Sequence, residues 1–267
     1  MTQKISFFSP VRYAPALLAI LIVPAIAPSL WAQAAAAAPQ SAKPEPKAVD
    51  YKAQHEHELA VDFGGLERYK ADDTAMAPPA AGEKRVVFMG DSITDGWKIS
   101  GPDGSFPGKP YVNRGISGQT TPQMLVRFRQ DVIDLLPSAV VILAGTNDLA
   151  GNTGPMTLEQ TEENLASMAD LATQNGIRVV FCSILPAFDY PWSPGLEPAP
   201  KIATLNQWIR SYAAQKGYTY VDYHSAMKDD RGGLPASLSK DGVHPLPAGY
   251  AVMAPLVEVG IEEALKK

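Results

Sequence analysis

The residue most able to do covalent chemistry in this 267-residue chain is Ser92, which follows the apolar run 86–88 within a Gly-Asp-Ser triplet. A serine hydroxyl is a weak nucleophile near neutral pH and needs an adjacent base. The sequence offers one far downstream, where Asp241 and His244 stand three residues apart on a short segment. His244 can accept the hydroxyl proton, and Asp241 can hold the imidazole in the required tautomer. These three residues predict attack by a serine on a carbonyl carbon.

Such an attack generates an oxyanion, and the sequence offers three hydrogen-bond donors for it. They are the backbone N–H of Ser92, the backbone N–H of Gly115 and the side-chain amide of Asn147. Gly115 suits the role because a backbone without a Cβ can come close to a substrate. Gly118 is interpreted as an ordinary turn glycine, and Asn147 has an Asx turn as its alternative.

Other reactive residue types have structural interpretations. Asp91 and Asp148 are expected to organise the loops around the site through hydrogen bonds, and His224 is expected to be a hydrogen-bonded, partly buried side chain. The single cysteine, Cys182, lies in an apolar run and is predicted to be a small buried hydrophobe. The chain contains no Cys/His spacing typical of zinc and no glycine-rich phosphate loop, so we expect no metal and no other cofactor.

Five apolar runs of strand length must position these residues. Their apolar character is continuous, which indicates strands buried on both faces, as in a parallel sheet covered by helices. Helical patterns with capping signals separate the runs. The predicted fold class is α/β, a three-layer αβα sandwich with a central five-stranded parallel sheet. The predicted strands cover residues 85–89, 111–113, 139–143, 178–183 and 218–222, and the main helices begin near Thr121, Thr157, Lys201 and Pro247.

Four short segments carry the candidate residues, three of them at strand ends, where open α/β sheets bind their ligands. They cover residues 90–94, 113–118, 145–148 and 241–244 and contain a Ser, a Gly, an Asn and a His in that order. From residue 85 onward the chain therefore resembles the SGNH (GDSL-type) hydrolase family. The resemblance implies a flavodoxin-like sheet and ester hydrolysis without a metal. The Asp95-Gly96-Trp97 extension is similar to bacterial relatives of platelet-activating-factor acetylhydrolase, which are lysophospholipase-like or acetylesterase-like.

The turn after the serine differs from that of the α/β-hydrolase fold. That fold places a glycine two residues after its nucleophile to relieve a strained elbow. Thr94 occupies the position here, and Ser92 follows the first strand of the chain. We expect a less strained nucleophile turn and no large cap domain.

The first residues have the pattern of an export signal. Lys4 and Arg12 precede the apolar stretch 16–23, and Ala32-Gln33-Ala34 matches a small-x-small cleavage site. The apolar stretch is shorter than the ~20 residues of a spanning helix, which favours a cleaved leader over a retained membrane anchor. The predicted organisation is a signal peptide over 1–34, a flexible Ala/Pro-rich tether over 35–47, a lead-in segment over 48–84 with a short helix at 62–69, and an SGNH hydrolase domain over 85–267.

Charge and the export signal limit the partners and the location. The chain carries a net charge of −5 and has no basic cluster, which argues against nucleic acid and against binding to anionic membranes. We expect an exported protein, periplasmic or secreted, whose partner is a small-molecule ester. The sequence leaves the oligomeric state open.

The substrate is the least determined feature of the sequence. Residues 186–195 form an aromatic, proline-rich loop, and the stretch 102–110 with Phe106 could form an opposite wall. Such aromatic residues suit a sugar ring, an acyl slot or packing on the sheet. The favoured substrate is a short-chain ester, above all acetyl groups on carbohydrate. The alternatives are a lysophospholipase or thioesterase for longer acyl chains and, in a different class, a non-catalytic ligand-binding module.

Overall fold

The computed structural model describes residues 51–267. The expected signal peptide (1–34) and tether (35–47) lie outside the described residues. Besides the strands and helices given below, this part of the chain contains a 3-10 helix at Ile133–Leu135.

A five-stranded sheet forms the centre of the fold, with the strand order β2-β1-β3-β4-β5 and every neighbouring pair parallel. The predicted α/β class is confirmed. In this register Gly90 at the end of β1 pairs with Gly115 of β2 on one side and with Leu143 of β3 on the other. Three strands therefore end side by side. The strands are β1 (Val86–Gly90), β2 (Tyr111–Gly115), β3 (Ala139–Leu143), β4 (Arg178–Cys182) and β5 (Thr219–Val221).

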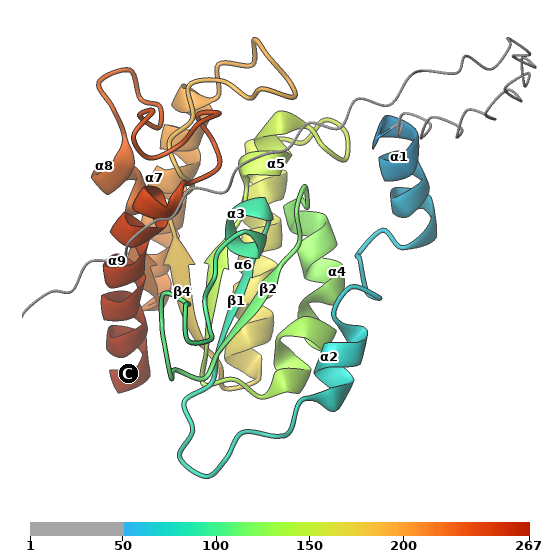
Figure 1. Ribbon diagram of the computed structural model, residues 1–267, viewed down its shortest axis with the longest axis vertical. Coiled ribbons are helices and arrows are strands. Elements are labelled where there is room, and N and C mark those ends of the chain that lie inside the picture. The colour runs from blue at the N-terminus through green and yellow to red at the C-terminus, as the bar shows by residue number, and fades with distance from the viewer. Residues whose placement is uncertain (1–50) are drawn as a thin grey trace, which may run out of the picture. The chain divides into compact units, whose positions relative to one another are not determined.

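Helices cover both faces of the sheet, as continuous apolar strands require. Alternate residues of β1, such as Val87 and Phe88, belong to two different cores. The first core lies under α4 (Thr121–Asp131), α6 (Leu158–Gln174) and α7 (Ala199–Lys216), and the second lies under α8 (Tyr223–Met227) and α9 (Pro247–Lys266). Figure 1 shows α9 on one side of the sheet and α4 with α6 on the other.

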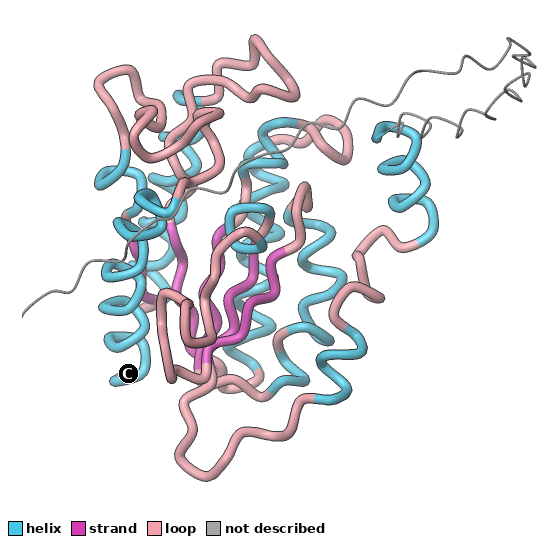
Figure 2. The backbone as a smooth tube through the Cα atoms, viewed as in Figure 1, coloured by secondary structure: helices cyan, strands magenta, loops and turns pink. Residues whose placement is uncertain are grey.

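The helix ends follow local sequence signals closely. Thr157 caps α6 with its hydroxyl, and Pro247 is the first residue of α9, as predicted. The α4 helix begins at Thr121, but its N-cap is Thr120, one residue earlier than predicted. The short helices α3 (Ser92–Asp95), α5 (Thr146–Ala150) and α8 follow β1, β3 and β5 with at most two residues between, whereas the long segment 183–198 after β4 contains no helix (Figure 2).

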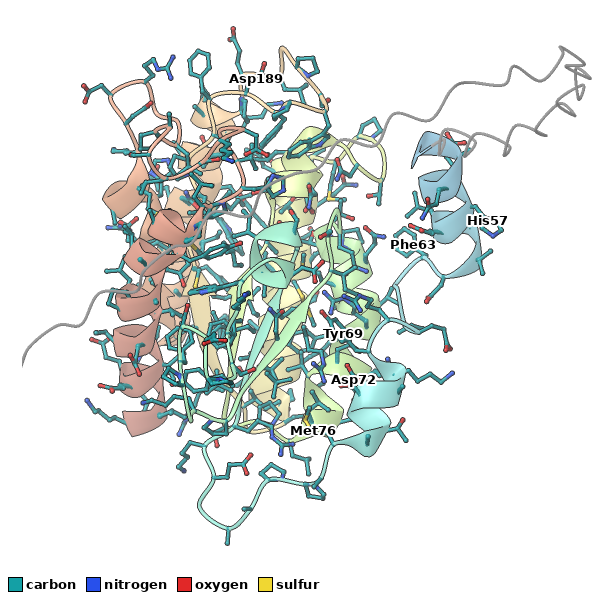
Figure 3. The ribbon with its side chains drawn as sticks, viewed as in Figure 1. His57, Phe63, Tyr69, Asp72, Met76 and Asp189 are labelled. Atoms are coloured by element: carbon teal, nitrogen blue, oxygen red, sulfur yellow. The ribbon has the colours of Figure 1, made fainter. Side chains whose placement is uncertain are left out.

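The lead-in segment departs from the prediction. Helices form at α1 (Tyr51–Val61) and α2 (Lys70–Ala75), whereas residues 62–69, predicted as helical, form turns between them. Two features interrupt the helix. Gly65 has a φ of +67°, and the carboxylate of Asp62 accepts the backbone N–H groups of Leu66 and Glu67. Tyr69, Asp72 and Met76 mark the path of the segment towards the sheet in Figure 3.

The stretch 102–110 does not form a wall of the site. Phe106 is buried and packs against Phe88, Trp97 and Tyr111 in the second core. Aromatic residues near a sheet edge fill core volume as readily as they line a site, because each buries a large apolar area. Among residues 51–267, no helix is both long and apolar enough to cross a membrane.

Candidate active site

Ser92 is held at the carboxyl edge of the sheet by a very tight turn. It begins the one-turn helix α3 (Ser92–Asp95), and the Asp91 carboxylate caps this helix by accepting the N–H of Ile93. Burial raises the pKa of the Asp91 carboxyl to about 7, although the Ile93 N–H and the nearby His244 act in the opposite direction. Ser92 has no positive φ. The less strained nucleophile turn expected from Thr94 is therefore present.

Two glycines let α3 approach the sheet. A Cβ on Gly90 would lie 2.1 Å from the Thr94 hydroxyl oxygen, and a Cβ on Gly115 would lie 2.1 Å from the Asp95 backbone nitrogen. No real Cβ tolerates such contacts, so both positions need glycine for reasons of space. On its other side α3 is linked to α9 through the Tyr250 hydroxyl, which donates to the Ile93 carbonyl over 2.8 Å.

Ser92, His244 and Asp241 form one hydrogen-bonded line. The Ser92 Oγ lies 2.9 Å from His244 Nε2, and His244 Nδ1 lies 2.7 Å from an Asp241 carboxylate oxygen. These are the contacts that a serine, a general base and its orienting carboxylate require. The structure thus brings together residues that are 152 positions apart in the chain.

The Asp241 carboxylate is fixed by its own loop. It accepts the backbone N–H groups of Val243 and His244 and the hydroxyl of Ser239. Partial burial acts to raise the pKa of Asp241, but these hydrogen bonds and the one from the His244 ring outweigh it and hold the pKa well below its usual value. Asp241 therefore stays ionised and keeps the His244 Nδ1 proton on the ring.

Asn147 lies on α5 (Thr146–Ala150), directly after β3, and is buried. Its Nδ2 donates to the Gln119 carbonyl over 2.9 Å, which uses only one of the two amide hydrogens. The next residue, Asp148, accepts the backbone N–H and the hydroxyl of Thr121 at the start of α4. Burial raises the pKa of Asp148. The prediction that Asp91 and Asp148 organise the loops through hydrogen bonds is confirmed.

Gly115, the last residue of β2, and Gly118, in the loop that follows, differ in how the structure uses their backbone N–H groups. The Gly115 N–H donates to the side-chain oxygen of Asn113 over 2.8 Å, and Gly115 does not line the cavity at Ser92. Gly118, expected to be a turn glycine, lines that cavity with a φ of +80°. Its N–H has no hydrogen-bond acceptor within residues 51–267. The Gly115 N–H is therefore already used within the protein, whereas Gly118 borders the cavity at Ser92.

A buried arginine supports this edge of the sheet. Arg127 is fully buried and paired with Asp131, and its guanidinium donates to the carbonyls of Gly90 and Arg114 and to the side chain of Gln119. Burial lowers the pKa of Arg127. One side chain thus ties the ends of β1 and β2 to the loop that carries Gly118. Sequence reasoning missed it because an arginine within a helix ordinarily faces solvent.

The cavity in front of Ser92 has a volume of about 560 Å³ and is open to solvent. Trp192, from the predicted aromatic loop, supplies the one large apolar side chain of its lining. The sequence reading missed Asp95, Ser117 and Asn152, although each lies within or next to one of the segments already singled out. The lining residues are Ser92, Asp95, Gly96, Ser117, Gly118, Asn147, Asn152, Trp192 and His244.

The remaining candidate groups lie elsewhere in the fold. Cys182 is buried in the second core, as predicted, and burial raises the pKa of its thiol to about 12. His224 is partly buried, and burial lowers its pKa. His57 lies on α1 and is exposed (Figure 3). Within residues 51–267 no group of three or more His, Cys, Asp or Glu side chains is arranged to hold a metal ion.

Comparison with known proteins places this geometry in a family. Residues 88–252 match the model of the GDSL-like lipase/acylhydrolase family. The chain belongs to this family. It is accordingly a carboxylic ester hydrolase with the SGNH fold.

The individual relatives of this GDSL-like hydrolase include a lipase and an esterase. It is 46% identical to a GDSL-like lipase of Bacteroides thetaiotaomicron of known structure, with a TM-score of 0.72 over 76% of this chain and 99% of that one. An acetylxylan esterase of Geobacillus stearothermophilus is 29% identical over 68% of this chain and 96% of its own length. A Bacillus subtilis lipoprotein, YqeF, is 32% identical over 29% of this chain and 33% of its own length.

Proposed function

We propose that the protein hydrolyses esters through an acyl-enzyme formed on Ser92. The Ser92 oxygen attacks the ester carbonyl carbon while His244 Nε2 takes the hydroxyl proton. The tetrahedral intermediate then collapses, its ester C–O bond breaks, and His244 returns the proton to the leaving alcohol. A water molecule, deprotonated by His244, attacks the acyl-enzyme and releases the carboxylic acid and free Ser92. Asp241 stabilises the imidazolium that forms in each half-reaction. The 2.9 Å and 2.7 Å contacts of the hydrogen-bonded line support this assignment.

The proposed oxyanion site combines two backbone N–H groups with one side chain. Ser92, as the first residue of α3, has no intrahelical acceptor for its N–H. Gly118 and Asn147 line the same cavity, and we assign the Gly118 N–H and the second amide hydrogen of Asn147 to the oxyanion. Three such donors, fixed before the reaction, stabilise charge that develops only in the transition state.

The favoured substrate is an acetyl or similarly short ester of a neutral polyol such as a carbohydrate. The observation that carries this proposal is the cavity lining, which offers an aromatic ring and polar groups but no aliphatic side chain. A long acyl chain would gain little from such a surface, because apolar burial is what binds it. The lining also contains the Asp95 carboxylate and no lysine or arginine, which disfavours the phosphate groups of lysophospholipids and acyl-coenzyme A. The similarity to an acetylxylan esterase points in the same direction.

The nucleophile is tested by covalent labelling. An organophosphonate should modify Ser92 in the wild-type chain and fail to modify Ser92→Ala. Ser92→Ala and His244→Ala should each lose several orders of magnitude in turnover while circular dichroism stays unchanged, because such residues act as a unit. Label found on another serine, with Ser92 unmodified, contradicts the assignment.

The substrate class is tested with an acyl-length series of one alcohol, from acetyl to dodecanoyl. We expect kcat/KM to be highest for acetyl and to fall steadily as the chain grows. Release of acetate from acetylated xylo-oligosaccharide should also be faster than release of fatty acid from lysophosphatidylcholine. An optimum at eight or more carbons favours the alternative of a lysophospholipase or thioesterase.

We also propose that the protein is exported, with cleavage after Ala34. The support is the leader pattern of residues 1–34, and the similarity of an 81-residue stretch to a lipoprotein is compatible with it. Mass spectrometry of protein from an exporting host should find a mature N-terminus near Ala35 in the periplasm or the medium. Extracytoplasmic protein that retains residues 1–34 favours a membrane-anchored form.

A further inference from the structure

Asn152 has a hydrogen-bond pattern that the reaction just proposed does not use. It lies in the turn after α5, between Gly151 and Gly154, and its side chain faces the cavity at Ser92. Its Nδ2 donates to the Asn147 side-chain oxygen and to the Gly118 carbonyl, each over 3.0 Å. Its Oδ1 accepts the indole N–H of Trp192 over 3.1 Å.

The chemistry of the partners fixes which way this amide points. An indole N–H can only donate, so the Asn152 atom that faces Trp192 must be the oxygen. The Gly118 carbonyl can only accept, so the atom that faces it must be the nitrogen. Both constraints select the same orientation. Asn152 therefore presents a donor to Asn147, whatever the orientation of the neighbouring amide.

The partners of Asn147 fix the orientation of its side-chain amide in the same way. Because Asn152 presents a donor, Asn147 must turn its oxygen towards Asn152 and its nitrogen away. The Gln119 carbonyl on the other side can only accept and selects the same orientation. The second Asn147 N–H is the group required for the oxyanion, so its direction depends on two neighbours. An amide turned the other way would present its oxygen to the oxyanion, which is repulsive.

Trp192 links this network to the rest of the site. Its ring stacks on Tyr190 with centroids 5.2 Å apart, and its centroid lies 5.9 Å from that of the His244 ring. Trp192 comes from the aromatic loop after β4, and Asn152 comes from the segment after β3. A single indole thus contacts both the proposed base and the residue that orients the oxyanion donors.

We infer that Asn152 is a positioning residue that orients two of the three oxyanion donors, Asn147 and Gly118, and that the Trp192 indole N–H sets its own orientation. This inference rests on the proposed function. Both Asn152 amide hydrogens are already donated within the protein, so Asn152 acts through Asn147 and Gly118 and donates nothing to the substrate.

The test is steady-state kinetics on one acetyl ester. Asn152→Ala should lower kcat by about 10- to 100-fold, the range expected when a catalytic group is displaced by a fraction of an ångström to an ångström, with KM changed less than about two-fold. Asn152→Asp should be worse than Asn152→Ala, because a carboxylate cannot donate and would draw the Asn147 N–H groups away from the cavity. A rise in KM at constant kcat would instead mean that Asn152 binds the substrate, and would overturn the inference.

Double variants separate positioning from a general loss of structure. In an Asn147→Ala background, Asn152→Ala should cost clearly less than it does in the wild-type chain. Trp192→Phe keeps an aromatic ring and removes the indole N–H. As a single variant it should lower kcat, and in the Asn152→Ala background it should lower kcat little further. The matched controls are Asn175→Ala, an exposed asparagine at the end of α6, and Trp208→Phe on α7, and both should leave kcat unchanged. Independent, multiplicative effects of the variants contradict the network.

Failure of this inference is distinguishable from failure of the proposed function. If Ser92 takes the organophosphonate label and Asn152→Ala keeps wild-type kcat, only the role of Asn152 is wrong. If Ser92 is not labelled and Ser92→Ala stays active, the proposed function is wrong. Thermal unfolding of each variant, followed by circular dichroism, identifies any that lose kcat through misfolding.

Discussion

At the scale of single residues, the proposed oxyanion site depends on the orientation of one buried amide, that of Asn147. Asn147 is 3% exposed and has no freedom to search for a substrate, because its neighbours occupy one N–H and its oxygen. A donor held in this way stabilises the transition state more than the ground state, since the ester oxygen carries its full charge only during the reaction.

Asn147→Ala should therefore reduce kcat by ~10²–10³-fold, about 2.7–4 kcal/mol, with little change in KM. Asn147→Asp should be at least as damaging, because it puts a carboxylate where negative charge develops. The measurement is steady-state kinetics on an acetyl ester, with Asn175→Ala as control. If Asn147→Ala keeps the parent kcat, the oxyanion rests on the backbone donors alone.

Asp91 gives a second prediction at this scale, for stability against pH. Burial raises its pKa in the folded state to about 7, so the folded protein keeps the proton to a higher pH than the unfolded chain, where the pKa is about 3.9. The stabilisation is complete below pH ~4 and is lost as the pH rises through about 7. Between pH 5 and 8, wild-type protein should lose on the order of 2 kcal/mol more than Asp91→Asn does. Urea unfolding at both pH values measures this, and equal losses contradict it.

At the scale of elements, the site depends on how closely α3 approaches β1 and β2. Both strands end in glycine, and the two glycines are paired in the sheet register. Each leaves space that α3 fills, so the nucleophile-bearing turn lies directly on the sheet with no side chain between them. The position of Ser92 is therefore set by backbone packing.

Gly115→Ala should destabilise the protein by about 3 kcal/mol or more, at the upper end of the range for overpacking. The new Cβ would meet backbone atoms of Thr94 and Asp95, which cannot move aside as a flexible side chain can. Gly82→Ala is the control, because Gly82 has a φ of +82° and no atom within 4 Å of its Cβ position, and strain alone should cost it ~1–2 kcal/mol. Urea unfolding compares the two. A smaller loss for Gly115→Ala would mean that α3 yields easily.

At the scale of the whole molecule, the lead-in segment is hydrogen-bonded to the elements that surround the site. The carbonyls of Phe63, Gly64 and Leu66 accept side-chain amides from Gln123, Gln119 and Gln130, each over 2.7–2.8 Å. The Tyr69 hydroxyl donates to the Gly115 carbonyl. These contacts reach both α4 and the loop that carries Gly118. By contrast, no α1 residue whose burial is described is buried.

Truncation should separate the two parts of the lead-in. A chain that begins at residue 62 should unfold within about 0.5 kcal/mol of the chain that begins at residue 48, because no α1 residue whose burial is described is fully buried. A chain that begins at residue 77 should lose more than about 2 kcal/mol and most of its kcat, since buried glutamines lose their acceptors. Urea unfolding and acetyl-ester kinetics measure both. Full activity of the chain that begins at residue 77 would show that the site does not need these hydrogen bonds.

The sequence by itself determined the features that depend on local order along the chain. Continuous apolar runs specified strands buried on both faces, and caps such as Thr157 specified helix starts, because burial and capping act within a few residues. The types of Ser92, His244, Asp241 and Asn147, and their places after strands or before the last helix, indicated the candidate site.

Only the tertiary structure decided which neighbouring residue faces the cavity. The sequence does not distinguish Gly115 from Gly118 as a backbone donor. The packing of α3 on the end of β2 buries Gly115, whereas the turn that follows leaves the Gly118 N–H without an acceptor among the described residues. For the same reason the sequence could not show that Phe106 packs in the core or that Asn152 hydrogen-bonds to Asn147. A side chain's partners are set by contacts between segments far apart in sequence, and no local pattern records those contacts.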